Sequence, residues 1–238
     1  MFRHKRPRRW GRWLLWGLMG LVLVSLLPVF ALRWIDAPTS AFMLARRWEV
    51  MTSGQEGFRL HYRWVDADAI SPQLPIALVA AEDQHFPRHN GFDVAAIRDA
   101  LEERANGEGG RGASTISQQV AKNLFLWSGR SWLRKGLEAY YTVLIEALWP
   151  KPRILEVYAN IAEFGDGVYG AEAAAQHYFR KPAVQLTAAE GARLAAVLPN
   201  PKRFRVDAPS PYVLRRQAWI QRQVRQLGGP DYLVTGSE

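Results

Sequence analysis

Apolar residues form one long uninterrupted run near the start of this chain and amphipathic patterns elsewhere. From Trp13 to Leu32, twenty consecutive residues carry no charge. At about 1.5 Å per helical residue, such a run spans a hydrocarbon core of roughly 30 Å, so we expect a transmembrane helix. Trp16 and Trp34 lie where interfacial aromatic residues occur. The run is longer than the apolar part of a signal peptide and no convincing small-residue cleavage site follows it, which favours an anchor over a cleaved leader.

The rest of the chain has mainly the 3.6-residue periodicity of amphipathic helices. Cap residues and prolines place the expected helices at residues 38–50, 71–81, 93–105, 114–126, 131–148, 151–163, 168–179, 187–198 and 211–227. Only the segment from Phe58 to Trp64 alternates with the period of a strand or an extended arm. The glycine-rich residues 106–112 predict a mobile loop.

These elements predict a mainly α protein with one short extended segment. The sequence contains neither internal repeats nor a low-complexity linker. We expect a basic tail (residues 1–12), a transmembrane anchor (13–34), a juxtamembrane helical segment (35–54) and one helical domain (55–238). In the juxtamembrane segment, Phe42, Leu44 and Trp48 either dip into the membrane surface or pack in the core.

Charge and composition narrow the range of functions. The formal net charge is +9, but six basic residues and no acidic ones precede residue 13, so the body is mildly basic and nucleic acid is not an expected partner. The same basic residues predict a cytoplasmic N-terminus and a domain beyond the membrane. The chain has no cysteine, which excludes disulfides, thiolate metal sites and a cysteine nucleophile. The glycine-rich loop lacks the features of a P-loop, so no nucleotide cofactor is expected.

The first candidate site is the stretch EDQHFPRHNG, which begins at Glu82 at the expected end of a helix. Glu82 and Asp83 are adjacent, so in regular backbone their side chains point in different directions. We expect one to face a cleft and the other a structural partner. Phe86, His89 and Gly91 would form a turn that anchors the carboxylates. A solvated acidic pair at a helix end is the alternative interpretation.

The second candidate is the stretch GASTISQQVAKN. Four polar residues in it have the spacing i, i+3, i+4 and i+7 of one helix face. They are Thr115, Gln118, Gln119 and Lys122. We expect Ser114 to cap this helix and the polar face to line a groove, although a solvated face has the same pattern.

The third candidate is a pair of cations beside a carboxylate. Arg134 and Glu138 are four residues apart, and Lys135 lies beside them in the sequence. In isolation this pattern is typical of an exposed ion pair worth about 0.3 to 0.5 kcal/mol.

Taken in order, the motifs of this chain resemble those of one family. EDQHFPRHNG, GASTISQQVAKNLF, RKGLEAYYTVLIE and KPRILEVYANIAEFGDGVYGAEAAA are similar to the four leading motifs of the peptidoglycan glycosyltransferases (glycosyltransferase family 51), and RLAAVLPNP to a fifth. The resemblance covers about residues 55–210 and is to the monofunctional biosynthetic transglycosylases of Gram-negative bacteria. No KTG box or downstream serine-lysine motif is present, so no transpeptidase domain is expected.

The resemblance implies a lysozyme-like helical domain and the polymerisation of lipid II. In this reaction the 4-hydroxyl of the lipid II N-acetylglucosamine attacks the anomeric carbon of the lipid-linked growing chain, and undecaprenyl diphosphate leaves with inversion. Glu82 matches the base of the family. Glu138 matches a second essential glutamate, which holds a divalent cation (Mg²⁺ or Mn²⁺) or orients the diphosphate.

The resemblance also implies a set of substrate-binding residues. They are Asp83, Phe86, His89, Ser114, Thr115, Gln118, Gln119, Lys122, Asn123, Arg134 and Lys135. Lys122, Arg134 and Lys135 match the residues that stabilise the leaving diphosphate. Glu156 and Arg193 remain open between structural and functional roles.

The implied partners are lipid II, the undecaprenyl-diphosphate-linked glycan, the bilayer, and cell-division or cell-wall synthesis proteins. The implied location is the bacterial inner membrane, crossed once, with the catalytic domain in the periplasm. A lytic hydrolase of the same polymer and an inactive anchored scaffold are the competing classes. The three cations argue against hydrolysis, which releases no diphosphate.

Overall fold

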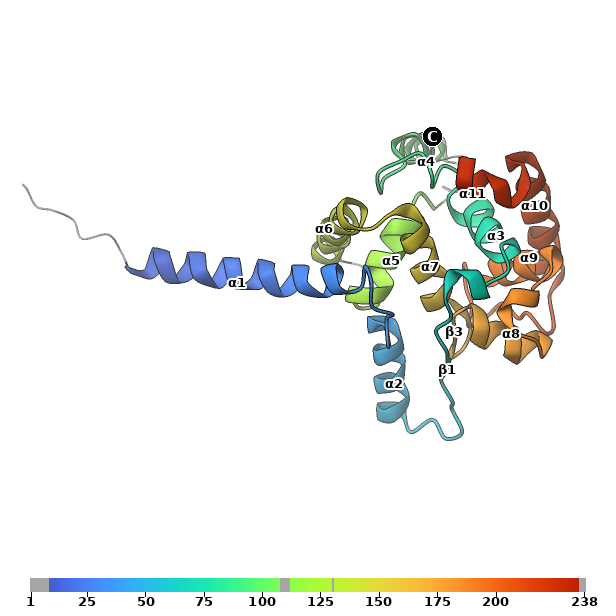
Figure 1. Ribbon diagram of the computed structural model, residues 1–238, viewed down its shortest axis with the longest axis horizontal. Helices are drawn as coiled ribbons and strands as arrows, with labels where there is room; N and C mark the ends of the chain where they lie inside the picture. The colour runs from blue at the N-terminus through green and yellow to red at the C-terminus, as the bar shows by residue number, and fades with distance from the viewer. Residues whose placement is uncertain (1–8, 108–111, 130, 236–238) are drawn as a thin grey trace, which may run out of the picture.

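The computed structural model describes residues 9–107, 112–129 and 131–235 of the chain. Residues 1–8 of the predicted basic tail and residues 108–111 of the predicted glycine-rich loop lie outside the described residues. Figure 1 shows one long helix, α1, that projects from a helical domain.

The described residues are mainly helical, which confirms the predicted fold class. The helices are α1 (Arg9–Ala31), α2 (Ala41–Ser53), α3 (Gln73–Glu82), α4 (Val94–Ala105), α5 (Ile116–Phe125), α6 (Trp132–Leu148), α7 (Lys151–Ile161), α8 (Ala171–Phe179), α9 (Ala188–Val197), α10 (Pro211–Leu227) and α11 (Tyr232–Thr235). Short 3-10 turns lie at η1 (Ala67–Ala69), η2 (Ala183–Gln185) and η3 (Gly229–Asp231).

A small sheet joins the middle of the chain to the predicted extended segment. Its strands are β1 (His61–Tyr62), β2 (Glu163–Gly165) and β3 (Val168–Tyr169), in the order β1-β3-β2. The pair β1–β3 is parallel and the pair β2–β3 is antiparallel. Of the predicted segment from Phe58 to Trp64, only β1 is paired.

Two predicted helix boundaries are wrong at this sheet. The helix expected over residues 151–163 ends at Ile161, and the helix expected over 168–179 begins at Ala171. Strands β2 and β3 occupy the interval. Gly170 has a φ of 86°, and a Cβ there would lie 2.5 Å from the carbonyl oxygen of Asn160, so the chain turns sharply here and cannot continue as a helix.

Helix α3 is the centre of the domain. Its residues Leu74 and Ile76 to Ala80 are buried, as expected for a helix that is apolar on all sides. Helices α7, α9 and α10 pack around it. Gly191 lets α9 approach closely, because a Cβ there would lie 2.8 Å from the carbonyl oxygen of Gln73. This packing places the end of α3, and therefore Glu82, among three neighbouring helices.

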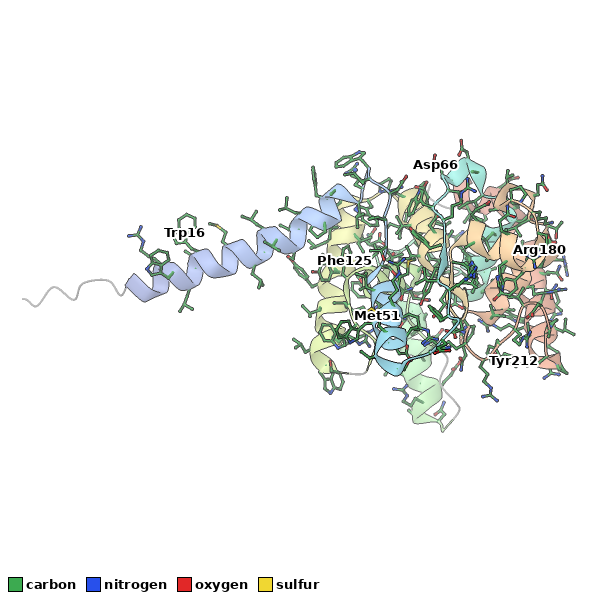
Figure 2. The ribbon with its side chains drawn as sticks, turned by 90° about the horizontal axis from the view of Figure 1, so that it is seen from below. Trp16, Met51, Asp66, Phe125, Arg180 and Tyr212 are labelled. Carbon is green, nitrogen blue, oxygen red and sulfur yellow. The ribbon has the colours of Figure 1, made fainter. Side chains whose placement is uncertain are left out.

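Helix α1 is long and apolar enough to cross a membrane, and an 18-residue window within Gly11–Ala31 has a mean hydropathy of 2.3. Its last turns attach to the domain. The hydroxyl groups of Ser25 and Tyr140 lie 2.8 Å apart, and the indole Nε1 of Trp149 donates to the carbonyl of Val29 at 2.7 Å. Figure 2 shows α6 running across the end of α1.

Arg153 of α7 also binds the end of α1. Its Nη2 donates to the carbonyl oxygens of Leu32 at 3.0 Å and Ile35 at 2.8 Å. These carbonyls follow the last turn of the helix and have no intrahelical partner of their own. The domain therefore holds α1 at a defined position.

Candidate functional site

The two adjacent acids of the first motif diverge because α3 ends between them. Glu82 is the last helical residue, and Asp83 has φ −161° and ψ 77°. Their side chains consequently point to different neighbours, as the sequence predicted. One carboxylate reaches toward α5 and α10, and the other toward the turn that follows.

Glu82 is held by two hydrogen bonds. The Nε2 of Gln119 donates to its Oε2 at 2.9 Å, and the Nη2 of Arg216 donates to its Oε1 at 3.2 Å. Its side chain is 16% exposed. Burial raises the pKa of Glu82 above its ordinary value, and the bonds from Gln119 and Arg216 and the charge of Lys122 oppose that rise.

Gln119 connects Glu82 to α7. Its Oε1 accepts a hydrogen bond from the hydroxyl of Tyr158 at 3.0 Å while its Nε2 donates to Glu82. Tyr158 is buried. The amide orientation is therefore fixed from both sides, and it holds the Glu82 carboxylate in place.

Asp83 binds structural partners. Its Oδ2 accepts from the backbone N–H of Ile116 at 2.9 Å, and both of its oxygens lie within 3.0 Å of the Nε2 of His89. The Nδ1 of His89 accepts from the backbone N–H of Gly91, so Nε2 carries the proton and donates to Asp83. Asp83 thereby joins the first motif to the start of α5.

The start of α5 differs from the prediction. Thr115 is the N-cap, and it forms a capping box with Gln118; the prediction that Ser114 caps this helix is wrong. Thr115 also donates to the carbonyl of Gly91 at 2.7 Å. Thr115 and Gln118 are buried and Ser114 is exposed, and none of the three lines the cavity to which Gln119 and Lys122 contribute.

A cation cluster lies on α6. Arg134 donates to the Oε2 of Glu138 at 3.0 Å, and the ammonium group of Lys135 donates to its Oε1. The Glu138 side chain is only 4% exposed. Because Glu138 is buried, its contacts with Arg134 and Lys135 do not form the exposed ion pair of which the sequence pattern in isolation is typical.

Lys122 faces the same cluster from α5. Burial lowers its pKa from the ordinary value, as do the charges of Arg134 and Lys135, whereas Glu138 and Glu82 raise it. Lys122 therefore interacts with both carboxylates, and it connects the surroundings of Glu82 to the surroundings of Glu138.

Gln119, Lys122 and Asn123 line a cavity of about 170 Å³. Its other lining residues are Phe42, Tyr158, Ile161, Ala162, Glu163, Tyr169, Leu198 and Pro201. A larger cavity of about 520 Å³ lies at the end of α10, around Gln221 and Arg225. It contains none of the predicted site residues, so we place the candidate site at the smaller cavity.

Several other residues singled out in the sequence have structural contacts. Phe86 is buried, and the ammonium group of Lys151 lies 4.5 Å from its ring centre. Glu156 accepts hydrogen bonds from the backbone N–H of Ala67 and from Arg153. Arg193 donates to Gln217 and so ties α9 to α10.

Sequence reasoning missed Arg216 and Glu163. Arg216 lies in α10, outside the five motifs, in a helix with several exposed arginines that give no local signal. Glu163 lies within the fourth motif, and burial raises its pKa. The signal for Glu163 was its place beside Gly165 and Gly167, where a helix is disfavoured.

The arrangement suits group transfer with an anionic leaving group, because Gln119, which binds the buried base candidate Glu82, and Lys122, which interacts with the cation cluster, line one polar cavity. A family model described as Transglycosylase matches residues 50–225. The chain belongs to this transglycosylase family, whose domain has the predicted lysozyme-like helical fold.

Related proteins agree with the family match. A biosynthetic peptidoglycan transglycosylase of Xanthomonas campestris pv. campestris (strain B100) is 62% identical over 209 residues, which is 88% of this chain and 85% of the relative. A protein of the same name from Xanthomonas axonopodis pv. citri is 58% identical over 229 residues, or 96% and 93%. Another from Xylella fastidiosa (strain 9a5c) is 58% identical over 89% of this chain and 87% of the relative.

Proposed function

We propose that this chain polymerises lipid II into linear glycan by inverting transfer of the lipid-linked growing chain. The observation that carries the proposal is the placement of Gln119 and Lys122 on one cavity wall. Gln119 binds Glu82, and Lys122 interacts with Glu138. The base and the anion site are therefore both connected to the same cavity. The names of the relatives support this chemistry.

On the base side, Glu82 accepts the proton of the acceptor 4-hydroxyl as its oxygen bonds to the anomeric carbon. A partly desolvated carboxylate is a stronger base than a solvated one, because burial raises its pKa. Tyr158 and Gln119 hold this carboxylate in place. Asp83, bound to His89 and to the start of α5, supports the geometry without facing the substrate.

On the leaving-group side, the bond between the anomeric carbon and the diphosphate breaks and negative charge develops on phosphate oxygens. Lys122, Arg134 and Lys135 supply positive charge for it. Glu138 orients Arg134 and Lys135 through the hydrogen bonds that it accepts. A hydrolase that released only a sugar hydroxyl would have no use for three such cations.

The predicted divalent cation stays a proposal, and the residues as placed do not hold one by themselves. Mg²⁺ takes several oxygen ligands, whereas both oxygens of Glu138 already bind cationic side chains. Among the described residues, no group of three or more His, Cys, Asp or Glu side chains is suited to a metal.

We further propose that α1 is a single-pass anchor with a cytoplasmic N-terminus and a periplasmic domain. From Trp13 to Val24, before the attachment at Ser25, the helix rises about 18 Å, so the last turns of α1 and the adjoining edge of the domain complete the roughly 30 Å of the hydrocarbon core. Helix α6, which lies across the end of α1, exposes Trp132 (93%) and Leu133 (69%). These residues suit the membrane interface, where lipid II and the lipid-linked glycan reside.

The test is to mix purified full-length protein with labelled lipid II in detergent or vesicles. We expect long uncrosslinked glycan and released undecaprenyl diphosphate. Shortening of preformed glycan without new polymer would instead identify a hydrolase. Turnover of neither substrate would favour the scaffold. Parallel reactions with and without a chelator test the divalent cation.

A further inference from the structure

Arg216 reaches Glu82 from an element that contains none of the five motifs. Its Nη2 lies 3.2 Å from Oε1 of Glu82 and 3.4 Å from the carbonyl oxygen of Ala81. That carbonyl belongs to the last turn of α3, where a cation is favoured by the helix dipole. Arg216 thus binds both the end of α3 and the carboxylate that the end of α3 presents.

The position of Arg216 is set by the packing of α10. Val213, Gln217 and Ile220 are the buried residues of this helix. The amide of Gln217 accepts from Arg193 and donates to the carbonyl of Ala189, so α10 is locked to α9. The guanidinium carbon of Arg216 also lies 5.9 Å from the ring centre of Trp219. The contact with Glu82 is therefore built into the fold and does not depend on a free surface side chain.

We propose that Arg216 is a positioning residue for Glu82, which fixes Oε1, keeps the carboxylate ionised before the reaction and speeds its return to that state. This inference rests on the proposed function. When the acceptor O–H bond breaks, its proton goes to Glu82 and its oxygen bonds to the anomeric carbon. The diphosphate departs with the electron pair of the broken bond. Glu82 then releases the proton to solvent, and the charge of Arg216 favours that release.

Two cations act on Glu82, and they come from different sides. Arg216 approaches from α10 and Lys122 from α5. Burial raises the pKa of Tyr158 of α7 well above its ordinary value, as do the charges of Glu82 and Asp83, so its hydroxyl stays neutral. Because Lys122 also serves the diphosphate in our account, Arg216 is the cation of the pair that is dedicated to the base.

The consequence of removing Arg216 is a change in pH dependence. Without its charge, the rise in the pKa of Glu82 caused by burial is opposed mainly by Gln119 and Lys122. More of the base is then protonated at a given pH, so the acid limb of the turnover profile moves to higher pH. A residue that only stabilised α10 would lower turnover equally at every pH.

The experiment measures kcat and KM for lipid II polymerisation from pH 5 to pH 9 in the full-length protein. For Arg216→Met we expect kcat to fall about tenfold or more at the acid end, to recover toward the wild-type value at the alkaline end, and KM to change little. Arg216→Lys keeps the charge and should have an intermediate profile. Arg215→Met, at the exposed neighbouring position of the same helix, is the matched control and should retain the wild-type profile.

Three results would overturn the inference. They are an unshifted acid limb in Arg216→Met, a rise in KM without a change in the profile, and an equal shift in Arg215→Met. If Arg216→Met does not fold by circular dichroism, the Arg216→Lys profile decides. Wild-type protein that makes no glycan would refute the proposed function itself, whereas active wild-type protein with an unshifted variant would refute only the role of Arg216.

Discussion

The regions around Glu82 and Glu138 both bury a carboxylate, but they surround it differently. Glu82 accepts one hydrogen bond from an amide and one from a single guanidinium group. Glu138 lies between Arg134 and Lys135, with Lys122 nearby. The first region balances one negative charge with one cation in contact, whereas the second contains a surplus of positive charge. Similar burial therefore favours proton acceptance in one region and anion binding in the other.

The largest expected effect is that of removing the base. Glu82→Gln keeps the shape of the side chain but cannot accept a proton, so we expect the initial rate of lipid II polymerisation to fall about 10² to 10⁴-fold. Glu56→Gln, on an exposed loop after α2, is the control and should keep full activity. A rate for Glu82→Gln within tenfold of wild type, with an unchanged unfolding midpoint, would remove Glu82 from the role of base.

A smaller loss is expected from the anion side. Lys122→Met should reduce kcat/KM about 10²-fold, because one cation that stabilises the leaving diphosphate is lost. The same change should weaken inhibition by added inorganic pyrophosphate. The control is Lys181→Met, which removes the lysine that pairs with Glu190. Undiminished pyrophosphate inhibition in Lys122→Met would contradict the assignment of this region.

The comparison also predicts how stability depends on pH. The folded-state pKa of Glu82 is raised above its ordinary value of 4.5, so folding favours the protonated form. The stability that the folded protein gains from protonated Glu82 is fully present below pH 4.5 and is lost as the pH rises through the raised pKa of Glu82. Because glutamine resembles the neutral form, the stability of Glu82→Gln relative to wild type should increase from pH 4 to pH 8 in urea unfolding. A difference that stays constant or shrinks over this range would contradict the raised pKa.

The smallest effect on turnover should come from the cap of α5. Thr115→Val removes the side-chain bond to the backbone N–H of Gln118, which should cost about 1 to 2 kcal/mol of stability. Turnover per folded molecule should stay within about threefold of wild type. Ser114→Ala, at the exposed neighbouring position, should change stability by less than about 0.5 kcal/mol. A large loss of turnover in Thr115→Val at unchanged stability would instead indicate that Thr115 binds the substrate.

Local signals in the sequence predicted the parts of the fold that local contacts determine. Asp93 caps α4, Thr187 forms a capping box with Glu190, and Gly228 ends α10, in agreement with the starts predicted at residues 93 and 187 and the end predicted at residue 227. The pairing of β1 with β3 joins segments about a hundred residues apart, so periodicity gave no sign of it. The predicted helices instead included Glu163 of β2 and both residues of β3.

The candidate site, too, could be predicted from the sequence only in part. Helical spacing placed Thr115, Gln118, Gln119 and Lys122 on one face. The capping box turned the first two inward, and the pattern Thr115-x-x-Gln118 would have revealed this because Ser114 has no glutamine or glutamate three residues later. The partner of Glu82 on α10 could not be predicted, because it depends on how α10 packs against α3.

The most direct test of the division between base and anion site measures binding and polymerisation in the same variants. Undecaprenyl diphosphate is titrated into full-length wild type, Glu82→Gln and Lys122→Met, and each protein is also assayed with lipid II. We predict that Glu82→Gln binds the diphosphate lipid as wild type does yet polymerises lipid II about 10² to 10⁴-fold more slowly, while Lys122→Met binds the diphosphate lipid about 10²-fold more weakly. Loss of binding in Glu82→Gln, or wild-type binding in Lys122→Met, would contradict the division between base and anion site.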